Sequence, residues 1–202
     1  FIMVDEHGEN SIVVASGANA RLTSADVERA ADAIAAATVL LVQLESPLDA
    51  VRTAVALAHS GGSLVILNPA PARALDSSLL SEVDIITPNA VEAEMLTGIK
   101  ITCEESLRAS AQTLLQRGIG RVLITLGRKG VFSATKEKSE LIQAFKVQAI
   151  DSTGAGDIFN GALAAFLAEG MQVEDAVRMA SAAAAIAVTR MGAQISTPLR
   201  AE

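Results

Sequence analysis

Short apolar runs alternate with segments of helical periodicity along most of the chain. Near-continuous Val, Ile and Leu runs separated by helices are typical of a parallel sheet that is buried on both faces. The pattern predicts an α/β fold, a doubly wound and mainly parallel sheet with helices on both faces. The expected strands lie at 39–44, 64–67, 83–86 and 121–126, and the helices between them lie at 47–59, 90–96 and 102–117.

Segments outside this alternation add further elements. Two helices carry N-terminal capping signals, in which Thr23 is paired with Asp26 and Thr102 with Glu105. Further helices are predicted at 23–37, 158–167 and 173–189. Strand-like stretches are predicted at 1–15, around a turn at 7–10, and at 131–149, where the polar residues 136–139 split them.

The composition narrows the classes of function. Half of the 202 residues are hydrophobic and 19% are charged, which is typical of a globular core. A net charge of −7 and an aromatic content of 2% argue against a nucleic-acid-binding surface. The longest apolar stretch, 33–42, is too short to cross a bilayer, so no membrane partner is expected.

Cysteine and histidine usage and the first residues bear on the cellular setting. A single cysteine, Cys103, excludes an internal disulfide and indicates a reducing, cytoplasmic compartment. His7 and His59 have no metal-binding spacing. The chain starts without an initiator methionine or a secretory signal. We therefore expect it to be part of a longer protein.

The segment 151–157, Asp-Ser-Thr-Gly-Ala-Gly-Asp, carries the strongest chemical signal. A turn of small residues leads directly into a helical pattern, which leaves unpaired N–H groups at the positive end of the helix dipole. Such a terminus can bind phosphate or stabilise a phosphoryl-transfer transition state. Asp157 is equally consistent with an ordinary first-turn acid that complements the dipole, and the local spacing leaves both interpretations open.

Other phosphate-binding motifs can be compared directly with the sequence. No Gly-Lys pair occurs, which excludes a P-loop, and Phe159 stands where the dinucleotide fingerprint needs a third glycine. Residues 125–130, Thr-Leu-Gly-Arg-Lys-Gly, follow a predicted strand, where ligand-binding loops of open α/β sheets lie. Taken alone, that segment is equally well interpreted as a glycine-rich turn between strands.

Four motifs together resemble the ribokinase-like (PfkB) family of sugar kinases in order and spacing. They are Leu-Asn-Pro-Ala-Pro at 67–71, Thr-Pro-Asn-Ala-Val-Glu at 87–92, and the segments 125–130 and 153–157. The match extends to 17–19, 42–45 and 187–194, so it covers essentially the whole chain. The last two segments are similar to the ribokinase branch rather than to fructokinases or adenosine kinases.

The resemblance implies a reaction and a set of site residues. The reaction is ATP-dependent phosphorylation of a sugar primary hydroxyl, with D-ribose giving D-ribose 5-phosphate, or with another sugar or a nucleoside as the alternative substrate. Asp157 would bind the sugar and act as its general base, Glu45 would contact the sugar, and Glu92 would help to place phosphate and Mg²⁺. The implied anion hole is Gly154, Ala155 and Gly156, and the implied ATP-binding residues are Asn89, Thr125, Leu126, Gly127, Arg128, Lys129, Gly130, Gly156, Asp157 and Ser181.

A monovalent cation site, usually for K⁺, is also implied by the resemblance. The last carbonyls of a helix lack intrahelical partners and carry partial negative charge, which suits a cation. Water or a glycine cap at Gly192 would satisfy those carbonyls as well. The implied cofactors are thus Mg²⁺ with ATP and K⁺ as an activator. The cation ligands would be Asp151, Thr153, Ala187, Arg190, Gly192 and Ser196.

The resemblance divides the chain into partial lid strands at 1–17 and a ribokinase-like nucleotide-binding domain at 18–202. Lids of this family pair between subunits, which implies a homodimer. An earlier family segment, with the first sheet strands and a Gly-Gly sugar-binding loop, has no counterpart in these 202 residues. We therefore do not expect this chain by itself to phosphorylate sugar. The alternative function is a truncated ATP-binding or assembly module without catalysis.

Overall fold

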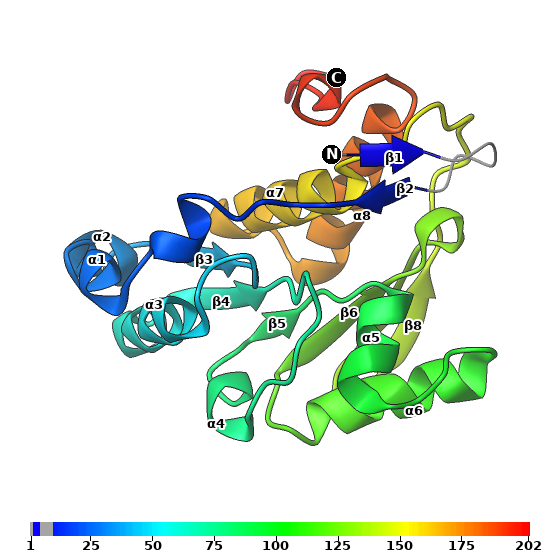
Figure 1. Cartoon of the computed structure of the whole chain (residues 1–202). Coiled ribbons are helices and arrows are strands. Elements are labelled where there is room, and N and C mark those ends of the chain that lie inside the picture. Colours follow the sequence, from blue (N-terminus) through cyan, green and yellow to red (C-terminus); the bar gives the residue numbers. More distant parts are fainter. Residues whose placement is uncertain (1, 5–9) are drawn as a thin grey trace.

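The computed structural model describes residues 2–4 and 10–202, and the side-chain surroundings from residue 13 onward. Its main sheet has six strands in the order β3-β4-β5-β6-β7-β8 (Figure 1). The pairs from β3 to β6 are parallel, whereas β7 is antiparallel to β6 and β8 to β7. The predicted mainly parallel sheet is therefore confirmed. Its strands are β3 (Val39–Val42), β4 (Leu64–Leu67), β5 (Ile85–Ile86), β6 (Arg121–Thr125), β7 (Val131–Ala134) and β8 (Ser139–Ile142).

Helices cover both faces of this sheet, as the sequence predicts (Figure 1). Successive side chains of a strand point to opposite faces. Val65 and Leu67 accordingly join the core beneath the first helical layer, and Ile66 joins the core beneath the second. The first layer holds α3 (Leu48–Gly61), α4 (Ser77–Leu80), α5 (Ala90–Thr97) and α6 (Glu104–Leu115), and the second holds α7 (Ala155–Ala168) and α8 (Val173–Ala187).

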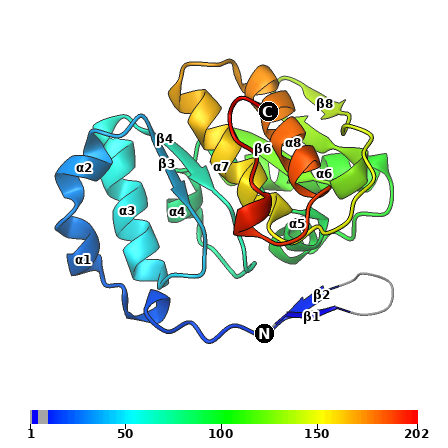
Figure 2. The ribbon, with the colours of Figure 1, turned by 90° about the horizontal axis from the view of Figure 1, so that it is seen from above.

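The single helix predicted at 23–37 is wrong, because two short helices form there, α1 (Ser24–Glu28) and α2 (Ala31–Ala35). The Ala30 N–H donates to the Val27 carbonyl at 2.9 Å, so the chain tightens by one residue between them. The predicted Thr23–Asp26 capping box is confirmed. Through Val27, this pair of helices packs against α3 (Figure 2).

The predicted capping box of the helix at 102–117 is also wrong. The helix starts at Glu104, and Cys103 is its N-cap. The Ser106 hydroxyl accepts hydrogen bonds from the Thr102 N–H at 2.9 Å and from the Cys103 N–H at 3.1 Å. Ser106 therefore accepts the Thr102 N–H that the predicted box assigns to Glu105, because the helix begins one residue later than the spacing suggests.

Among the other elements, α4 has no counterpart in the sequence prediction, whereas the strand-like pattern at 1–15 does give strands. β1 (Ile2–Val4) and β2 (Asn10–Ile12) pair antiparallel in a separate two-stranded sheet that stands apart from the body in Figure 2. Most of the turn predicted at 7–10 lies outside the described residues. Short 3₁₀ turns lie at Asn19–Arg21, Gly127–Lys129 and Gln194–Ser196. Across the part of the chain that the structure covers, every helix is too short or too polar to traverse a bilayer.

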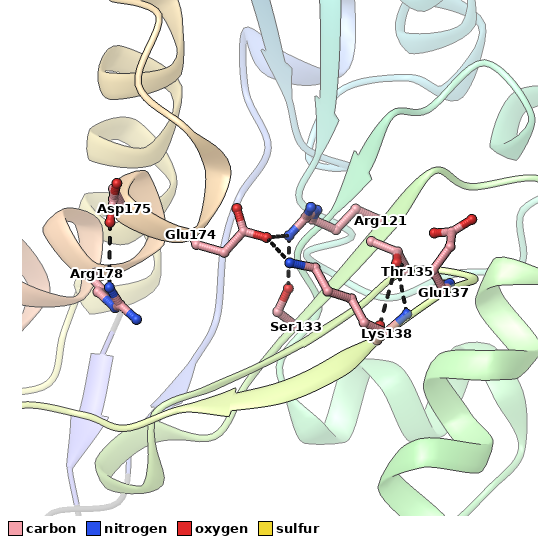
Figure 3. A network of polar contacts seen from close by, with 8 residues as sticks. All are labelled: Arg121, Ser133, Thr135, Glu137, Lys138, Glu174, Asp175 and Arg178. Carbon is pink, nitrogen blue, oxygen red and sulfur yellow. Dashed lines mark hydrogen bonds and ion pairs between the residues drawn. The ribbon is translucent and has the colours of Figure 1, made fainter.

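An ion-pair network ties α8 to the antiparallel end of the sheet (Figure 3). Glu174 accepts from Lys138 Nζ at 2.8 Å and from Arg121 Nη1 at 3.1 Å, and Arg121 also donates to the Ser133 hydroxyl. The hydrogen bonds, above all the one from Lys138, lower the pKa of Glu174 from 4.5 to about 2. In the same turn of α8, the one ion-pair partner of Asp175 among the described residues is the exposed Arg178.

We expect Glu174→Gln to lower the free energy of unfolding by about 1 kcal/mol at pH 7. Because the pKa of Glu174 is depressed in the folded state, its stabilisation is complete above about pH 4.5 and disappears as the pH falls toward 2. Denaturant unfolding at pH 7, 4.5 and 3 should therefore show the difference from wild type shrinking. Asp175→Asn is the matched control, because it removes only an exposed ion pair and a dipole interaction, and its effect at pH 7 should be at most about 1 kcal/mol. A Glu174→Gln effect that is independent of pH contradicts the assignment.

Candidate active site

The glycine-rich turn predicted to bind an anion does open a helix. Gly154 is the N-cap of α7 and has a φ of +76°, a left-handed conformation that favours glycine. A Cβ at this position would lie 3.4 Å from Ala193. The chain therefore turns sharply at Gly154, and the Ile158 N–H closes the first helical bond onto the Gly154 carbonyl at 2.9 Å.

The N–H groups of this turn differ in how they are used. The Ala155 N–H donates to the Ser152 carbonyl at 3.2 Å, so it is committed to the turn. Within the described part of the chain, the N–H groups of Gly156 and Asp157 have no backbone partner. These two donors lie at the positive end of a helix of 14 residues, which is the arrangement that binds phosphate.

Asp157 lies in the first turn of α7, and its carboxylate is exposed. It forms neither a hydrogen bond nor an ion pair with any other described residue, so it does not cap the helix. It lines a cavity of about 600 Å³ between α7, α8 and the C-terminal residues 193–202. Gly154 and Gln194 also contribute to this wall, but most of the lining is apolar. We call this space the Asp157 cavity.

A second cavity, of about 450 Å³, lies against Gly156 and Ala155. We call it the Gly156 cavity. The resemblance assigned most of its polar lining to ATP, and these residues come from three separate parts of the chain. The predicted ATP-binding residues that the structure brings together here are Thr125, Gly127, Arg128, Gly130, Gly156 and Ser181.

Four other residues predicted to bind ATP do not line the Gly156 cavity. The Leu126 side chain packs against the core, and Lys129 is exposed. Asp157 faces the other cavity. Asn89 lies close to the edge of the site, because it forms a parallel bridge with Thr125.

Gly130 makes a close backbone approach that no other residue could make. Its φ is +107°, and a Cβ would lie 2.0 Å from the Ile142 carbonyl oxygen and 2.8 Å from the Ala144 nitrogen. The Leu126 N–H donates to the Gly130 carbonyl at 2.8 Å and closes the turn. The glycine therefore lets the chain after β8 pass over the 125–130 loop and form one wall of the Gly156 cavity.

The sequence analysis did not identify residues 144–149 as part of a site, although most of them line the Gly156 cavity. Residues 131–149 were predicted as strand-like, but strand structure ends at Ile142. Phe145 and Val147 lie beyond it, line the Gly156 cavity and remain about half exposed. The alternation of Phe145 and Val147 with polar residues was the available signal in the sequence. Such a pattern is typical of a strand, but it also occurs in an extended segment that covers a cavity.

Asn89 and Glu92 form a reciprocal capping box at the start of α5. The Asn89 Oδ1 accepts from the Glu92 N–H, and the Glu92 Oε2 accepts from the Asn89 N–H, both at 2.8 Å. Burial raises the pKa of the Glu92 carboxyl, which the Asn89 bond partly offsets. Among the described residues, the Asn89 Nδ2 and the second Glu92 oxygen have no hydrogen-bond partner, so both remain for a ligand. Glu45, by contrast, is exposed beyond β3 and lines neither cavity.

Asp151 joins two segments that are far apart in the sequence. Its Oδ1 accepts from the Thr153 N–H and its Oδ2 from the Gly192 N–H, both at 2.9 Å. The bonds from Thr153 and then from Gly192 hold the pKa of Asp151 below its usual value, so the group is an anion at neutral pH. The segments predicted to bind a cation are therefore adjacent.

Two of the other predicted cation ligands, Ala187 and Ser196, also have hydrogen-bond partners in this region. The Ala187 carbonyl accepts the Arg190 N–H at 2.9 Å, and the buried Ser196 hydroxyl donates to the Ala193 carbonyl at 2.6 Å. Gly192 has a φ of +93°. A backbone carbonyl that accepts one hydrogen bond keeps a second lone pair. The carbonyls in this region can therefore still bind a cation.

Comparison with known proteins identifies the family. Residues 1–200 match the family described as pfkB family carbohydrate kinase. The chain belongs to this family. Among pfkB relatives, the ribokinase of Haemophilus influenzae is 50% identical over 202 residues, which cover 100% of this chain and 66% of that protein.

Solved structures of ribokinases share the fold. The Thermotoga maritima ribokinase has a TM-score of 0.89 at 37% identity, covering 100% of this chain and 66% of that one. The Arabidopsis thaliana ribokinase complexed with ribose and ATP has a TM-score of 0.87 at 30% identity, covering 98% and 64%. The fold is therefore the ribokinase-like α/β fold. This pfkB chain spans about two thirds of the length of these relatives.

Proposed function

We propose that the protein is an ATP-dependent carbohydrate kinase that converts D-ribose to D-ribose 5-phosphate. One observation carries the proposal. The first turn of α7 separates two cavities, with the predicted ATP-binding residues around Gly156 on one side and the carboxylate of Asp157 on the other. A phosphoryl group held by the free N–H groups of that turn would lie between its donor and its acceptor. The ribokinases among the relatives supply the choice of ribose.

The proposed reaction uses groups of this chain at each step. ATP binds in the Gly156 cavity with its γ-phosphate toward the N–H groups of Gly156 and Asp157. The Asp157 carboxylate takes the proton of the sugar primary hydroxyl, and that oxygen attacks the γ-phosphorus. The bond from this phosphorus to the bridging oxygen breaks, and ADP leaves. The helix N-terminus stabilises the charge on the transferring group, which is the main catalytic need in phosphoryl transfer.

Two metal ions complete the proposal. Mg²⁺ bound with ATP would neutralise phosphate charge. At the start of α5, the Asn89 amide could donate to a phosphate oxygen, and the free Glu92 oxygen could help to hold the metal. The Asp151 carboxylate, the Ser196 hydroxyl and nearby backbone carbonyls offer only oxygen atoms, which suits K⁺. The carbonyls proposed as its ligands are those of Thr153, Ala187, Arg190 and Gly192.

We expect K⁺ to raise kcat, with Na⁺ and Li⁺ less effective, because a cation beside Asp151 would order the turn that leads into α7. The measurement is the initial rate in chloride salts at fixed ionic strength, with tetramethylammonium as the inert control. Asp151→Asn should lose most of this activation, since it removes the charge while keeping the size of the side chain. Equal rates with K⁺, Na⁺ and tetramethylammonium would rule out the site.

The sugar side of the site supports a further part of the proposal. The Asp157 cavity is lined mainly by apolar groups, whereas sugar hydroxyls need polar partners. We propose that most of these partners lie in the third of the relatives' length that this chain does not match. The same apolar lining favours a second candidate function, an ATP-binding or assembly module without catalysis.

A single assay separates the two candidate functions. The protein at the full length of its relatives is incubated with ATP and a panel of pentoses, hexoses and nucleosides, and both ADP and the phosphorylated product are measured. Multiple turnover with ribose supports the kinase. ATP binding without turnover on any acceptor supports the assembly module.

We further propose a cytoplasmic homodimer. Its subunits would pair through the separate two-stranded sheet of β1 and β2, because small sheets with free edges tend to pair with other strands. Sedimentation equilibrium of the full-length protein, with and without residues 1–17, tests the dimer. A dimer that survives this deletion would contradict pairing through β1 and β2.

A further inference from the structure

A buried asparagine lies in the second turn of α7, in a place where an amide is costly. Asn160 is 4% exposed, next to the core residues Phe159 and Leu163. A buried amide is tolerated only when its polar atoms are bonded. Asn160 Nδ2 donates to the Gly156 carbonyl at 2.9 Å, and Oδ1 accepts from the Thr87 hydroxyl at 2.6 Å. Both ends of the amide are therefore used.

The Thr87 end of this bridge is firmly held. Thr87 follows β5 and is 1% exposed. Its N–H donates to the Leu67 carbonyl at 3.0 Å, and its own carbonyl accepts from Asn68 Nδ2 at 3.1 Å. Two residues later comes Asn89, at the edge of the Gly156 cavity. The bridge thus connects the ends of β4 and β5 to the first turn of α7.

The Gly156 end of the bridge acts on the reacting part of the site. The Gly156 carbonyl and the Asp157 N–H belong to one planar peptide unit, so fixing the direction of the carbonyl also fixes the direction of the N–H. That N–H is one of the two free donors of the turn, and the same peptide leads to the Asp157 Cα. A hydrogen bond to the carbonyl also polarises the peptide and strengthens its N–H as a donor.

We propose that Asn160, anchored by Thr87, is a positioning residue that orients the Gly156–Asp157 peptide for phosphoryl transfer. The proposal rests on the proposed kinase function for its catalytic consequence. Asn160 lines neither cavity, so it acts through the turn and not on a ligand. It joins two of the sequence motifs, 87–92 and 153–157, through Thr87 and Asn160, two residues to which the sequence analysis assigns no role.

The kinetic test uses Asn160→Leu, which keeps the shape of the side chain and removes both of its bonds. Thr87→Val is a milder change, because it removes the Thr87 hydroxyl, with its long contact to the Leu67 carbonyl at 3.5 Å, and leaves the Asn160–Gly156 bond in place. In the full-length protein, we expect Asn160→Leu to lower kcat by about 10- to 100-fold. The KM values for ATP and ribose should change much less. Thr87→Val should lower kcat by a smaller factor, and Thr87→Ser, which keeps the hydroxyl, should restore it. The two changes should be less than additive in the double variant.

Thr97→Val is the matched control. Thr97 bonds to the buried Ser110 between α5 and α6, at 3.2 Å, so this variant loses a comparable hydroxyl contact away from α7. It should lower the melting temperature without changing kcat. A kcat loss in Thr97→Val equal to that in Asn160→Leu would mean that general destabilisation explains the effect, and the proposal would fail.

A spectroscopic readout separates this proposal from the kinase function. The ¹⁵N chemical shift of the Asp157 amide reports on hydrogen bonding of the Gly156 carbonyl, and it can be measured without substrates. It should move in Asn160→Leu and Thr87→Val and stay in place in Thr87→Ser and Thr97→Val. If wild type proves inactive, the kinase function is wrong, and the shift alone decides whether Asn160 orients the turn. An unmoved shift, or wild-type kcat in Asn160→Leu, overturns the proposal.

Discussion

Asp157→Asn is expected to lower kcat by about 10²- to 10⁴-fold in the full-length protein. Asparagine has nearly the same size and can occupy the same exposed place in the first turn of α7, so folding and ATP affinity should stay close to wild type. What is lost is the ability to accept a proton from the sugar hydroxyl. The measurements are kcat with ribose, the Kd for ATP by calorimetry and the melting temperature.

A control variant is needed to distinguish a general base at Asp157 from an acid that only complements the helix dipole. Asp175 is also an exposed acid in the first turn of a helix, α8. Asp175→Asn therefore removes the same kind of dipole interaction, worth about 0.3–1 kcal/mol. It should affect stability as much as Asp157→Asn and leave kcat unchanged. If Asp157→Asn keeps at least half of the wild-type kcat, Asp157 is not the general base.

Gly130→Ala is expected to cost at least about 3 kcal/mol of folding free energy and to abolish nucleotide binding. The new Cβ would meet two backbone atoms of the segment after β8, which can move away only if the wall of the Gly156 cavity moves with them. Denaturant unfolding and ATP titration measure the two effects.

Gly62→Ala is the control that separates the cost of a left-handed backbone conformation from the cost of a steric clash at Cβ. Gly62 has a φ of +78° at the end of α3, and a Cβ there would meet no atom within 4 Å. Its cost is the left-handed conformation alone, about 1 kcal/mol. ATP binding should be normal in this variant. Equal losses in the two variants would show that the close approach at Gly130 has no consequence beyond its dihedral angle.

The fold was largely predictable because the inner strands β4, β5, β6 and β7 are mostly buried on both faces. Runs such as 64–67 have no polar residue to place in solvent, so they specify a covered parallel sheet directly. The hydrophobic pattern did not predict features that depend on individual hydrogen bonds. Whether 23–37 forms one helix or two depends on a single tightened bond at Ala30, and residue spacing carries no signal for it.

In the candidate site, the turns of the backbone were predictable from the sequence where they require glycine, as at Gly154 and Gly130. It was less predictable where a residue acts through another. Asn160 resembles any helical polar residue in the sequence, and its partner Thr87 lies 73 positions away. Pairings over such separations are fixed by the packing of α7 on the sheet. Glu45 is a case in which the sequence suggested a site residue that the geometry does not place in either cavity. It is an acid at the end of a strand, yet it lines neither of them.

The two cavities share one helical turn, and successive residues of a helix point about 100° apart. Ala155 and Gly156 therefore face one compartment while Gly154 and Asp157 face the other. In the proposed assignment, the Asp157 cavity holds the acceptor and the Gly156 cavity holds the nucleotide, so side chains around the first can change over evolution without altering those around the second. On that assignment, the acceptor can be exchanged while the phosphate donor is retained, because only the small residues of the turn itself contact both compartments.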